Sequence, residues 1–475
     1  MALDMLGAAR VTNRLSDRLQ KRRPEIRRQV RYLRGESGRL RFASEEFADY
    51  FSKRFEGFSD NWVAPVAQAP AERMIHLGIR LPGENLPDRE LHRVFVANEC
   101  DRGLSEAILM MIATGRSYAL VSPEDGVTPR VTFEHPSQAI VESDPITGQP
   151  RYGLIMWTDD DEDYDYAQLL TDDGQVFKLR RRTTKQDGAE WRETDLFGWE
   201  ERPGEEPVGH HGLPGLPLVE FRNQSLLDDT PTSDISFVMS MQDGINLAWA
   251  YLLNALDYAS LKQRVVLNSG PPMRPILDED GNVVGKQPVE LQELTQDRVV
   301  FLDGENVSIG EWSSSNLDTF SKVIEQAVEH IAAQTRTPPH YLVAKMVNTS
   351  AESLTIAEAG LVSKTQERIT YVNPALRRLY WMIASAMGDE AKAEAVRSSK
   401  LLWRDVQYRS DAQRADALQK KRAMGYPLQY ILEQDGVDPD DIERILRMAR
   451  DEARMDPIAD LARQMSTPGL SRDNA

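Results

Sequence analysis

The sequence predicts an α+β fold that is mostly helical. Apolar residues recur every three or four positions over 233–264, 316–336 and 354–404, which is the spacing of one buried helix face. From Ser117 to about Phe221, short apolar runs alternate with turn residues, as in strands. A second β segment, 265–315, lies between the first two of these helices. We therefore expect a helical and β-rich N-terminal part, then helix, β module, helix and a very long third helix.

Composition excludes several classes of protein. The chain has 475 residues, 41% of them hydrophobic, and no run approaches the roughly 18 apolar residues of a membrane span. A single cysteine, Cys100, excludes internal disulfides and cysteine-based zinc sites. The N-terminal MALDMLGAARVTNRLSDRLQ lacks the apolar core of a signal peptide, so we do not expect secretion, and the single cysteine fits a reducing cytoplasm. The net charge of −18 argues against binding nucleic acid over the whole surface.

The charge is unevenly distributed along the chain. Residues 10–41 hold twelve Lys or Arg against three acids, with Leu15, Leu19, Ile26, Val30 and Leu33 on a helix face interrupted at Pro24. This basic helix either binds nucleic acid or an acidic partner, or is a solvated helix that docks on an acidic part of its own assembly. The acidic counterpart is TDDDEDYDY, residues 158–166, which is typical of an exposed turn and a weak candidate for a metal site.

The N-terminal region changes from helices to strands near residue 115. The last helix before this point has Ser105 as its expected N-cap and Gly115 as its stop. In the β region that follows, Asp172, Asp173 and Gly174 separate YAQLL from QVFKL. This is the pattern of a β-hairpin.

The helix predicted over 233–264 opens with Ser233 or Asp234 as its cap, and its apolar face runs from Val238 to Ala259. In the β module that follows, RPILDEDGNVVG predicts a hairpin with its turn at Asp280 and Gly281. The chain then re-enters a helix at 316–336.

A short polar segment, 337–353, precedes the longest helix. That helix contains Pro374, which lacks a backbone donor, so we expect a kink or a restart with Asn373 as cap. Shorter charged helices follow over 405–455, and 456–475 is expected to be a flexible tail.

Motifs of catalysis are absent from the sequence. There is no G-x-x-x-x-G-K-[ST], G-x-G-x-x-G, H-E-x-x-H or G-x-S-x-G segment. His210 and His211 have no third ligand nearby in sequence, so we interpret them as an exposed pair. We therefore expect no catalytic residue, no metal site and no cofactor.

The order of these segments resembles the portal proteins of tailed double-stranded DNA bacteriophages, over about residues 25–450. The most specific segments are QDGINLAWAYLLNALDYASLKQ, HIAAQTRTPPHYL and NTSAESLTIAEAGLVSKTQERI, and GRSYALVSPEDGVTPRVTFEHPSQAIVESDPITGQPRYGLIMW is similar to the wing of actinobacterial-phage portals. The resemblance implies a wing (1–232), a first stem helix (233–264), a clip (265–315), a second stem helix (316–336), a tunnel-loop region (337–353), a long kinked helix returning to the wing (354–404) and a helical crown (405–455).

The resemblance also implies a function. Portal subunits form a ring of about twelve copies at one capsid vertex of the virion. The ring is assembled in the host cytoplasm. It conducts double-stranded DNA during packaging and ejection, and terminase and head–tail connector proteins dock on it. The expected partners are therefore other copies of the chain, DNA, terminase, the major capsid protein, a head–tail adaptor and a scaffolding protein.

Two groups of residues carry the expected activity. The tunnel loop would line the channel with Lys345, Asn348, Thr349 and Ser350, whose short polar groups suit phosphate contacts that do not distinguish bases. The stem faces are too long for one chain to cover, so neighbouring subunits would bury Leu252, Leu256, Phe320 and Ile324. Two other functions stay open: another head–tail adaptor or minor capsid protein, and a metal-dependent hydrolase that uses the acidic run and stray histidines.

Overall fold

The computed structural model describes residues 3–455 except 37–39, 56–57, 124–127, 184–191, 228–229, 261–263, 268–272, 278–281, 289–298, 303–307, 312–316, 339–350, 408–410 and 438. The chain divides into two compact units. We call the first the body (Met1–Arg34, Val63–Phe237 and Thr335–Ala475) and the second the hairpin unit (Gly35–Trp62 and Val238–Gln334). Among the described residues, no helix combines the length and apolarity that crossing a bilayer requires.

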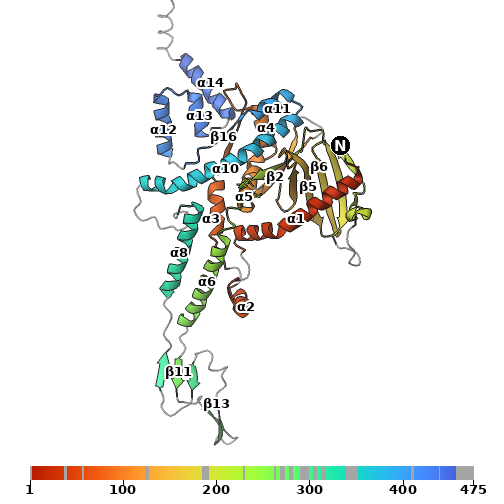
Figure 1. Cartoon of the computed structure of the whole chain (residues 1–475). Coiled ribbons are helices and arrows are strands. Elements are labelled where there is room, and N and C mark those ends of the chain that lie inside the picture. The colour runs from red at the N-terminus through yellow and green to blue at the C-terminus, as the bar shows by residue number, and fades with distance from the viewer. Residues whose placement is uncertain are drawn as a thin grey trace, which may run out of the picture. The chain divides into compact units, whose positions relative to one another are not determined.

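A six-stranded antiparallel sheet forms one side of the body, in the order β4-β5-β6-β7-β8 with β9 also paired to β7. Its strands are β4 (Ala139–Ser143), β5 (Pro150–Asp159), β6 (Tyr164–Thr171), β7 (Gln175–Arg182), β8 (Glu200–Glu201) and β9 (Val208–His210). Helix α1 (Met5–Arg34) crosses one face of this sheet (Figure 1). Leu15 and Leu19 of α1 are buried against Leu169 and Phe177, so the apolar face expected from the sequence forms the core here.

A second, three-stranded sheet has the order β10-β2-β3, formed by β2 (Arg116–Ser122), β3 (Arg130–Glu134) and β10 (Leu218–Arg222). Helix α5 (Cys100–Thr114) packs on it, preceded by α3 (Val63–Ala71) and α4 (Arg89–Ala97). Gly115 ends α5 with a φ of 85°, and a Cβ there would lie 2.8 Å from the carbonyl oxygen of Pro231. Only glycine fits this turn without strain.

The C-terminal part of the chain returns to the body. Helix α10 (Ala351–Ala386) contacts β10 and β2, and α11 (Glu390–Arg397) packs on α10. Strand β16 (Lys400–Trp403) pairs antiparallel with β1 (His76–Arg80), so the C-terminal part of the chain is joined to the N-terminal part of the body. The helices α12 (Asp411–Ala423), α13 (Leu428–Asp435) and α14 (Pro439–Met455) follow.

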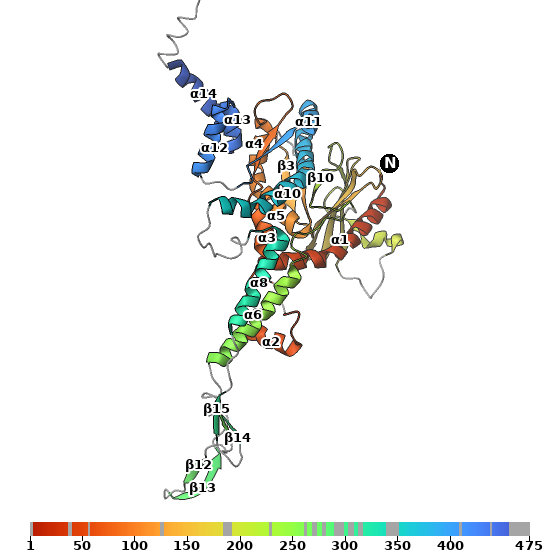
Figure 2. The same cartoon turned by 60° about the vertical axis from the view of Figure 1, so that its left-hand side comes forward.

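The hairpin unit contains two long helices and a β module. Helices α6 (Met239–Ser260) and α8 (Leu317–Thr335) lie side by side in both views (Figures 1 and 2). Between them in the chain are β11 (Arg264–Leu267), β12 (Met273–Leu277), β13 (Val283–Pro288), β14 (Val299–Leu302) and β15 (Ser308–Glu311). β12 and β13 pair antiparallel as expected for a hairpin, whose turn at Asp280 and Gly281 lies outside the described residues, and β14-β11-β15 form a small sheet. Helix α2 (Glu45–Arg54) packs against α6.

The expected fold class, α+β and mostly helical, is confirmed, and several local details differ. α6 begins at Met239, several residues after either expected cap. α5 begins at Cys100, so Ser105 lies inside a helix and is not its cap. α10 continues past Pro374 as one helix, and Asn373 accepts a hydrogen bond from the Trp403 indole (2.9 Å) and does not start a new helix. The expected tail, 456–475, lies outside the described residues.

Candidate functional site

The four expected channel residues, Lys345, Asn348, Thr349 and Ser350, lie outside the described residues. What the structure does show is how the chain is held on either side of them. The body's chain ends at Phe237, resumes at Thr335, and continues through the undescribed segment into α10. We call Phe237, where the chain leaves the body, the exit point, and Thr335, where it re-enters the body, the return point. The residues that hold these two points flank the candidate site.

The exit point is held by a buried charge cluster around Asp234. Its carboxylate accepts two hydrogen bonds from the Arg368 guanidinium, at 3.0 and 3.1 Å, and one from the Asn223 amide at 2.8 Å. The Lys364 ammonium lies 3.2 Å from the same carboxylate and donates to the Val66 carbonyl oxygen. Burial lowers the pKa of Lys364, and the adjacent carboxylate opposes that effect. Since Lys364 and Arg368 both belong to α10, the long helix holds the segment that leads into α6.

The return point is also tied to α10. The hydroxyls of Thr335 and Thr337 are hydrogen bonded at 2.9 Å, and both residues are buried. Between them, Arg336 adopts a left-handed φ of 54° and its guanidinium lies 3.6 Å from Glu367. The first turns of α10 are held by a further ion pair between Arg73 and Glu358, 3.3 Å apart and largely buried. Helix α10 therefore contacts the chain both just before it leaves the body, at Asp234, and just after it returns, at Arg336.

The four expected assembly residues differ in their surroundings. Leu252 and Ile324 are buried within this chain, whereas Leu256 is 38% exposed and Phe320 is half-buried. Two further large apolar side chains of the same helices are exposed: Tyr251 at 42% on α6 and Val323 at 52% on α8. The exposed apolar surface of α6 and α8 therefore includes Leu256 and also Tyr251 and Val323, which the sequence did not single out.

Helix α2 supports α6 and was not foreseen. Phe47 and Phe51 of α2 pack with Ala250, and the Phe47 ring lies 5.2 Å from that of Tyr251. Nearby, the Asp60 carboxylate accepts a hydrogen bond from the Trp249 indole at 2.6 Å. The aromatic spacing of Phe47, Phe51 and Phe55 was the available signal, because side chains four residues apart share a helix face.

The other candidate chemistry has a structural explanation. His210 is exposed but His211 is buried, so the expectation of an exposed pair is wrong for His211. The His211 ring bonds the Thr171 carbonyl oxygen at 2.9 Å and accepts from the Leu213 amide. Among the described residues, no three His, Cys, Asp or Glu side chains converge as a metal centre would require.

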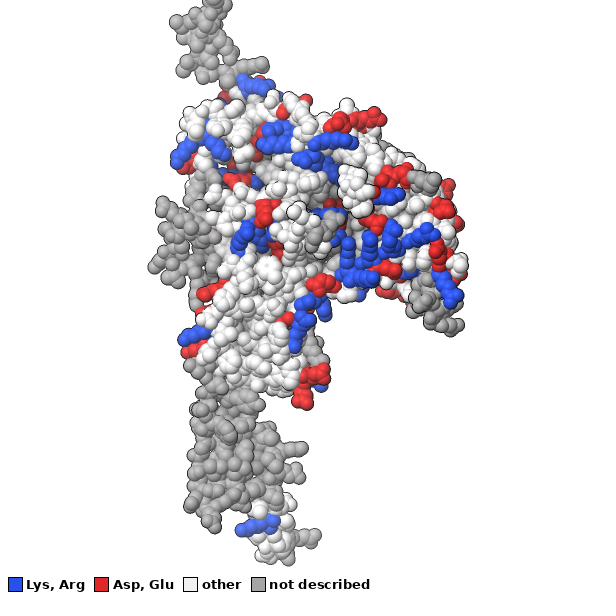
Figure 3. Space-filling model, in the orientation of Figure 1, with Lys and Arg blue, Asp and Glu red and all other residues white. Residues whose placement is uncertain are grey.

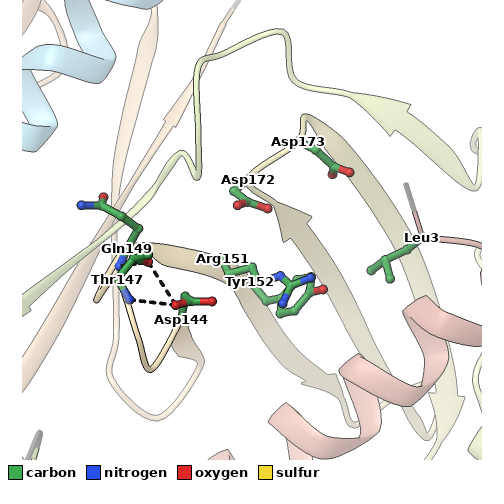
Figure 4. Close-up of a pocket in the computed structure, with 8 residues that line it drawn as sticks. All are labelled: Leu3, Asp144, Thr147, Gln149, Arg151, Tyr152, Asp172 and Asp173. Carbon is green, nitrogen blue, oxygen red and sulfur yellow. Dashed lines mark hydrogen bonds between the residues drawn. The ribbon is translucent and has the colours of Figure 1, made fainter. Parts of the chain in front are cut away.

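An open polar pocket of about 330 Å³ lies at one end of the six-stranded sheet (Figure 4). Its Asp144 carboxylate accepts hydrogen bonds from the Ile146 and Thr147 amides, which lower the pKa of Asp144. Asp173 accepts from the Thr171 hydroxyl. These two carboxylates stabilise the turns that carry them and form no ligand cluster.

Comparisons with known proteins agree on one family. The phage portal protein family, SPP1 Gp6-like, matches residues 13–455. The portal protein of Mycobacterium phage D29 is 26% identical over 365 residues, covering 74% of this chain and 70% of that protein. The portal protein of Mycobacterium phage L5 is 24% identical over 363 residues, covering 74% and 69%.

Solved structures that align with the chain include two from gene transfer agent (GTA) particles. The neck of the native GTA particle is 15% identical, with a TM-score of 0.42, over 82% of this chain and 93% of that one. The virion of the native particle is 16% identical, with a TM-score of 0.39, over 82% and 94%. The family match spans nearly all of the described residues, including both helices of the hairpin unit and the whole of α10. The chain belongs to the SPP1 Gp6-like family of phage portal proteins.

Proposed function

We propose that this portal protein assembles into a closed ring of about twelve copies at one capsid vertex and forms the channel through which DNA enters and leaves. The observation that carries the proposal is the hairpin unit, in which α6 and α8 bracket a β module and leave large apolar side chains exposed. Such residues on a long helix pair are typical of a surface that another subunit covers.

The tunnel segment, Ala344–Ser353, is proposed to line the narrow part of the channel. Its short polar side chains can contact phosphates, and Lys345 adds one positive charge per subunit. Moving DNA requires weak contacts, because each neutralised phosphate strengthens binding and its salt dependence. The buried clusters that hold α10 support this proposal, since a constriction needs a rigid frame.

The chain is proposed to act without catalysis of its own. Its sequence has no phosphate-binding loop, so a separate terminase motor would supply the energy for packaging. We propose that terminase docks on the β module of the hairpin unit. The major capsid protein, a head–tail adaptor and a scaffolding protein are the further partners proposed for a ring assembled in the host cytoplasm and carried in the virion.

Two other functions were open from the sequence. A different head–tail adaptor or minor capsid protein is disfavoured by the match to a portal family over residues 13–455. A metal-dependent hydrolase would need a group of ligands that the described residues do not bring together.

The proposal is tested by a deletion within the tunnel segment that leaves the contacts of α10 with Asp234 and Arg336 in place. Deleting Met346–Ser350 should preserve ring assembly, because both points where the body's chain leaves and returns are fixed by contacts outside the deletion. Packaging or retention of DNA in procapsids should fall, because the moving contact with phosphates is lost. Lys345→Glu should also assemble and should impair passage of DNA. Physiological salt screens charges that are separated by more than a Debye length of ~8 Å, but it does not screen the repulsion between a glutamate and a phosphate in contact.

The matched control is Lys420→Glu, the same charge change on an exposed lysine of α12 whose ion pair, among the described residues, is with Asp416 of the same helix. It should package like the unchanged protein. Normal packaging and retention by both tunnel variants would contradict the proposed role of the segment.

A further inference from the structure

The basic face at the C-terminal end of α1 has no role in the function proposed above. Arg27, Arg31 and Arg34 are spaced by four and three residues, so they lie on one side of the helix over about 10 Å. All three are exposed, and no described carboxylate pairs with them. We call these three arginines the basic stripe.

The N-terminal half of α1 differs from the stripe. Figure 3 shows Lys and Arg side chains gathered along α1. Nearer the N-terminus these residues are paired: Arg10 bonds Glu193, and Arg14 and Arg18 share Glu142, each at 2.5 Å. Arg28 pairs with Glu25. The body therefore neutralises Arg10, Arg14 and Arg18 with its own acids, whereas no described acid forms an ion pair with Lys21, Arg22, Arg23 or the stripe.

The body also carries an unmatched acidic segment. Between β5 and β6, residues Asp159–Asp163 are five consecutive acids, and the last four of them are exposed. No Lys or Arg among the described residues pairs with this segment, which we call the acidic turn. Its shape is fixed: the Asp159 carboxylate accepts hydrogen bonds from the amides of Asp161 (3.0 Å) and Glu162 (3.2 Å). The Tyr166 hydroxyl holds the Glu162 carboxylate at 2.6 Å.

We infer that the acidic turn of one copy docks on the basic stripe of its neighbour. The two patches are complementary in charge, and guanidinium groups bind carboxylates with directed hydrogen bonds. Because the patches are distinct surfaces of one unit, their contact is head-to-tail, which is the type of interface that closes a ring. The inference rests on the proposed function only in requiring assembly of several copies.

A second copy fits the stripe better than duplex DNA does. Three arginines over about 10 Å provide few phosphate contacts. The chain as a whole carries a net charge of −18, which repels a polyanion. The acidic turn, by contrast, is held in a fixed shape and is present at equal stoichiometry with the stripe.

Charge reversal on the full-length chain tests the inference, with ring assembly measured by sedimentation velocity and native mass spectrometry in 50 mM and 500 mM salt. Changing the three stripe arginines to Glu should raise the concentration needed for assembly by at least about tenfold at low salt, as expected for loss of three exposed ion pairs per interface. Changing Asp160, Asp161 and Glu162 to Lys should do the same. Combining both sets in one chain should restore assembly to within about threefold of the unchanged protein, because every interface again joins opposite charges.

The controls separate charge from folding and from DNA binding. Reversing Arg102, Lys420 and Arg444, which are exposed and whose ion pairs among the described residues are with acids three or four positions away, makes the same charge change and should leave assembly unaltered. A milder set, the stripe arginines changed to Gln, should lower assembly in the same direction with an unchanged circular dichroism melt. Anisotropy of a 30-base-pair duplex should be the same with the unchanged chain and with the stripe variant.

Failure of the combined variant to recover, or normal assembly of both single-set variants, would overturn the inference. So would loss of duplex binding in the stripe variant with assembly unaffected, because the stripe would then be a nucleic-acid site. If the unchanged chain forms open head-to-tail oligomers, and the combined variant recovers assembly while the two single-set variants do not, the proposed ring would be contradicted and the inferred contact would be supported. A chain that stays monomeric at low salt would overturn both.

Discussion

The second half of α10 in the body and the helices α6 and α8 of the hairpin unit bury their apolar side chains to different degrees. In the body, the second half of α10 places Val372, Leu376, Leu379, Tyr380 and Ile383 out of contact with solvent. The buried Asp234 carboxylate is paired with Lys364 and Arg368 of the same helix. In the hairpin unit, α6 and α8 bury one face and leave Tyr251, Leu256 and Val323 exposed.

This difference indicates which part of the molecule depends on other copies. A helix with a single buried stripe is stable when that stripe is covered, and further apolar side chains outside it are typical of an interface. We therefore interpret the second half of α10 as a segment buried by its own chain, and the hairpin unit as a segment whose exposed apolar side chains neighbouring subunits would cover.

The largest effect is expected from breaking the body at its buried charge cluster. Asp234→Ala leaves Lys364 and Arg368 buried without their carboxylate, which should lower the free energy of unfolding by about 3–5 kcal/mol. Urea unfolding of the monomeric subunit measures this change. Glu367→Ala removes a half-buried carboxylate of the same helix and should cost under about 1 kcal/mol. Equal, small losses in both variants would show that the cluster does not hold the body together.

The hairpin unit offers a pair of substitutions that separate folding from assembly. Leu252→Asp buries a carboxylate within the chain and should lower the free energy of unfolding by about 3 kcal/mol. Leu256→Asp, one helical turn later, should change subunit stability by less than about 1 kcal/mol and should prevent ring formation. Circular dichroism melts and native mass spectrometry distinguish the two outcomes. Normal rings from Leu256→Asp would remove this part of α6 from the interface.

A smaller, pH-dependent effect is expected in the body at His76. Burial lowers the pKa of its imidazole to about 3, and the ring bonds the Tyr380 hydroxyl at 2.9 Å. Below pH 6.5 the unfolded chain takes up a proton that the folded chain does not, so stability falls as pH decreases from 6.5 towards 3. The expected slope is about 1.4 kcal/mol per pH unit.

The measurement is urea unfolding of the subunit at several values between pH 4 and pH 7. In His76→Phe the slope should be shallower by about that amount over this range, because the titrating group is gone. Identical slopes in the two proteins would show that His76 is not buried as a neutral ring.

Local patterns predicted the elements of this fold well where each was set by its own residues. The helix expected at 316–336 is α8, Leu317–Thr335, and the stop at Gly115 and the hairpin at Asp172–Gly174 are both present. Periodicity and turn chemistry suffice in these cases because the burying face and the turn residues are encoded locally.

The errors arose where a local residue serves a distant contact. Ser233 was expected to cap α6; its hydroxyl oxygen accepts from the Ser236 amide in the turn before α6, and the hydroxyl also donates to the Ala113 carbonyl oxygen, 120 residues away in sequence. Asp234, the other expected cap, likewise accepts a hydrogen bond from Arg368 of α10, which is distant in sequence. Nothing in the sequence pairs Asp234 with Lys364 and Arg368, so the cluster that frames the candidate channel required the structure. The channel residues Lys345, Asn348, Thr349 and Ser350 stay a prediction.

The central claim is that copies of this chain form a closed ring whose channel is lined by Ala344–Ser353. Cryo-electron microscopy of the assembled full-length protein tests it most directly. We predict a closed ring of about twelve subunits, with Leu256 and Val323 covered by neighbouring copies and Lys345 facing the axis at the narrowest point. A monomer, an open filament, or a ring with this segment on its outer rim would contradict the account.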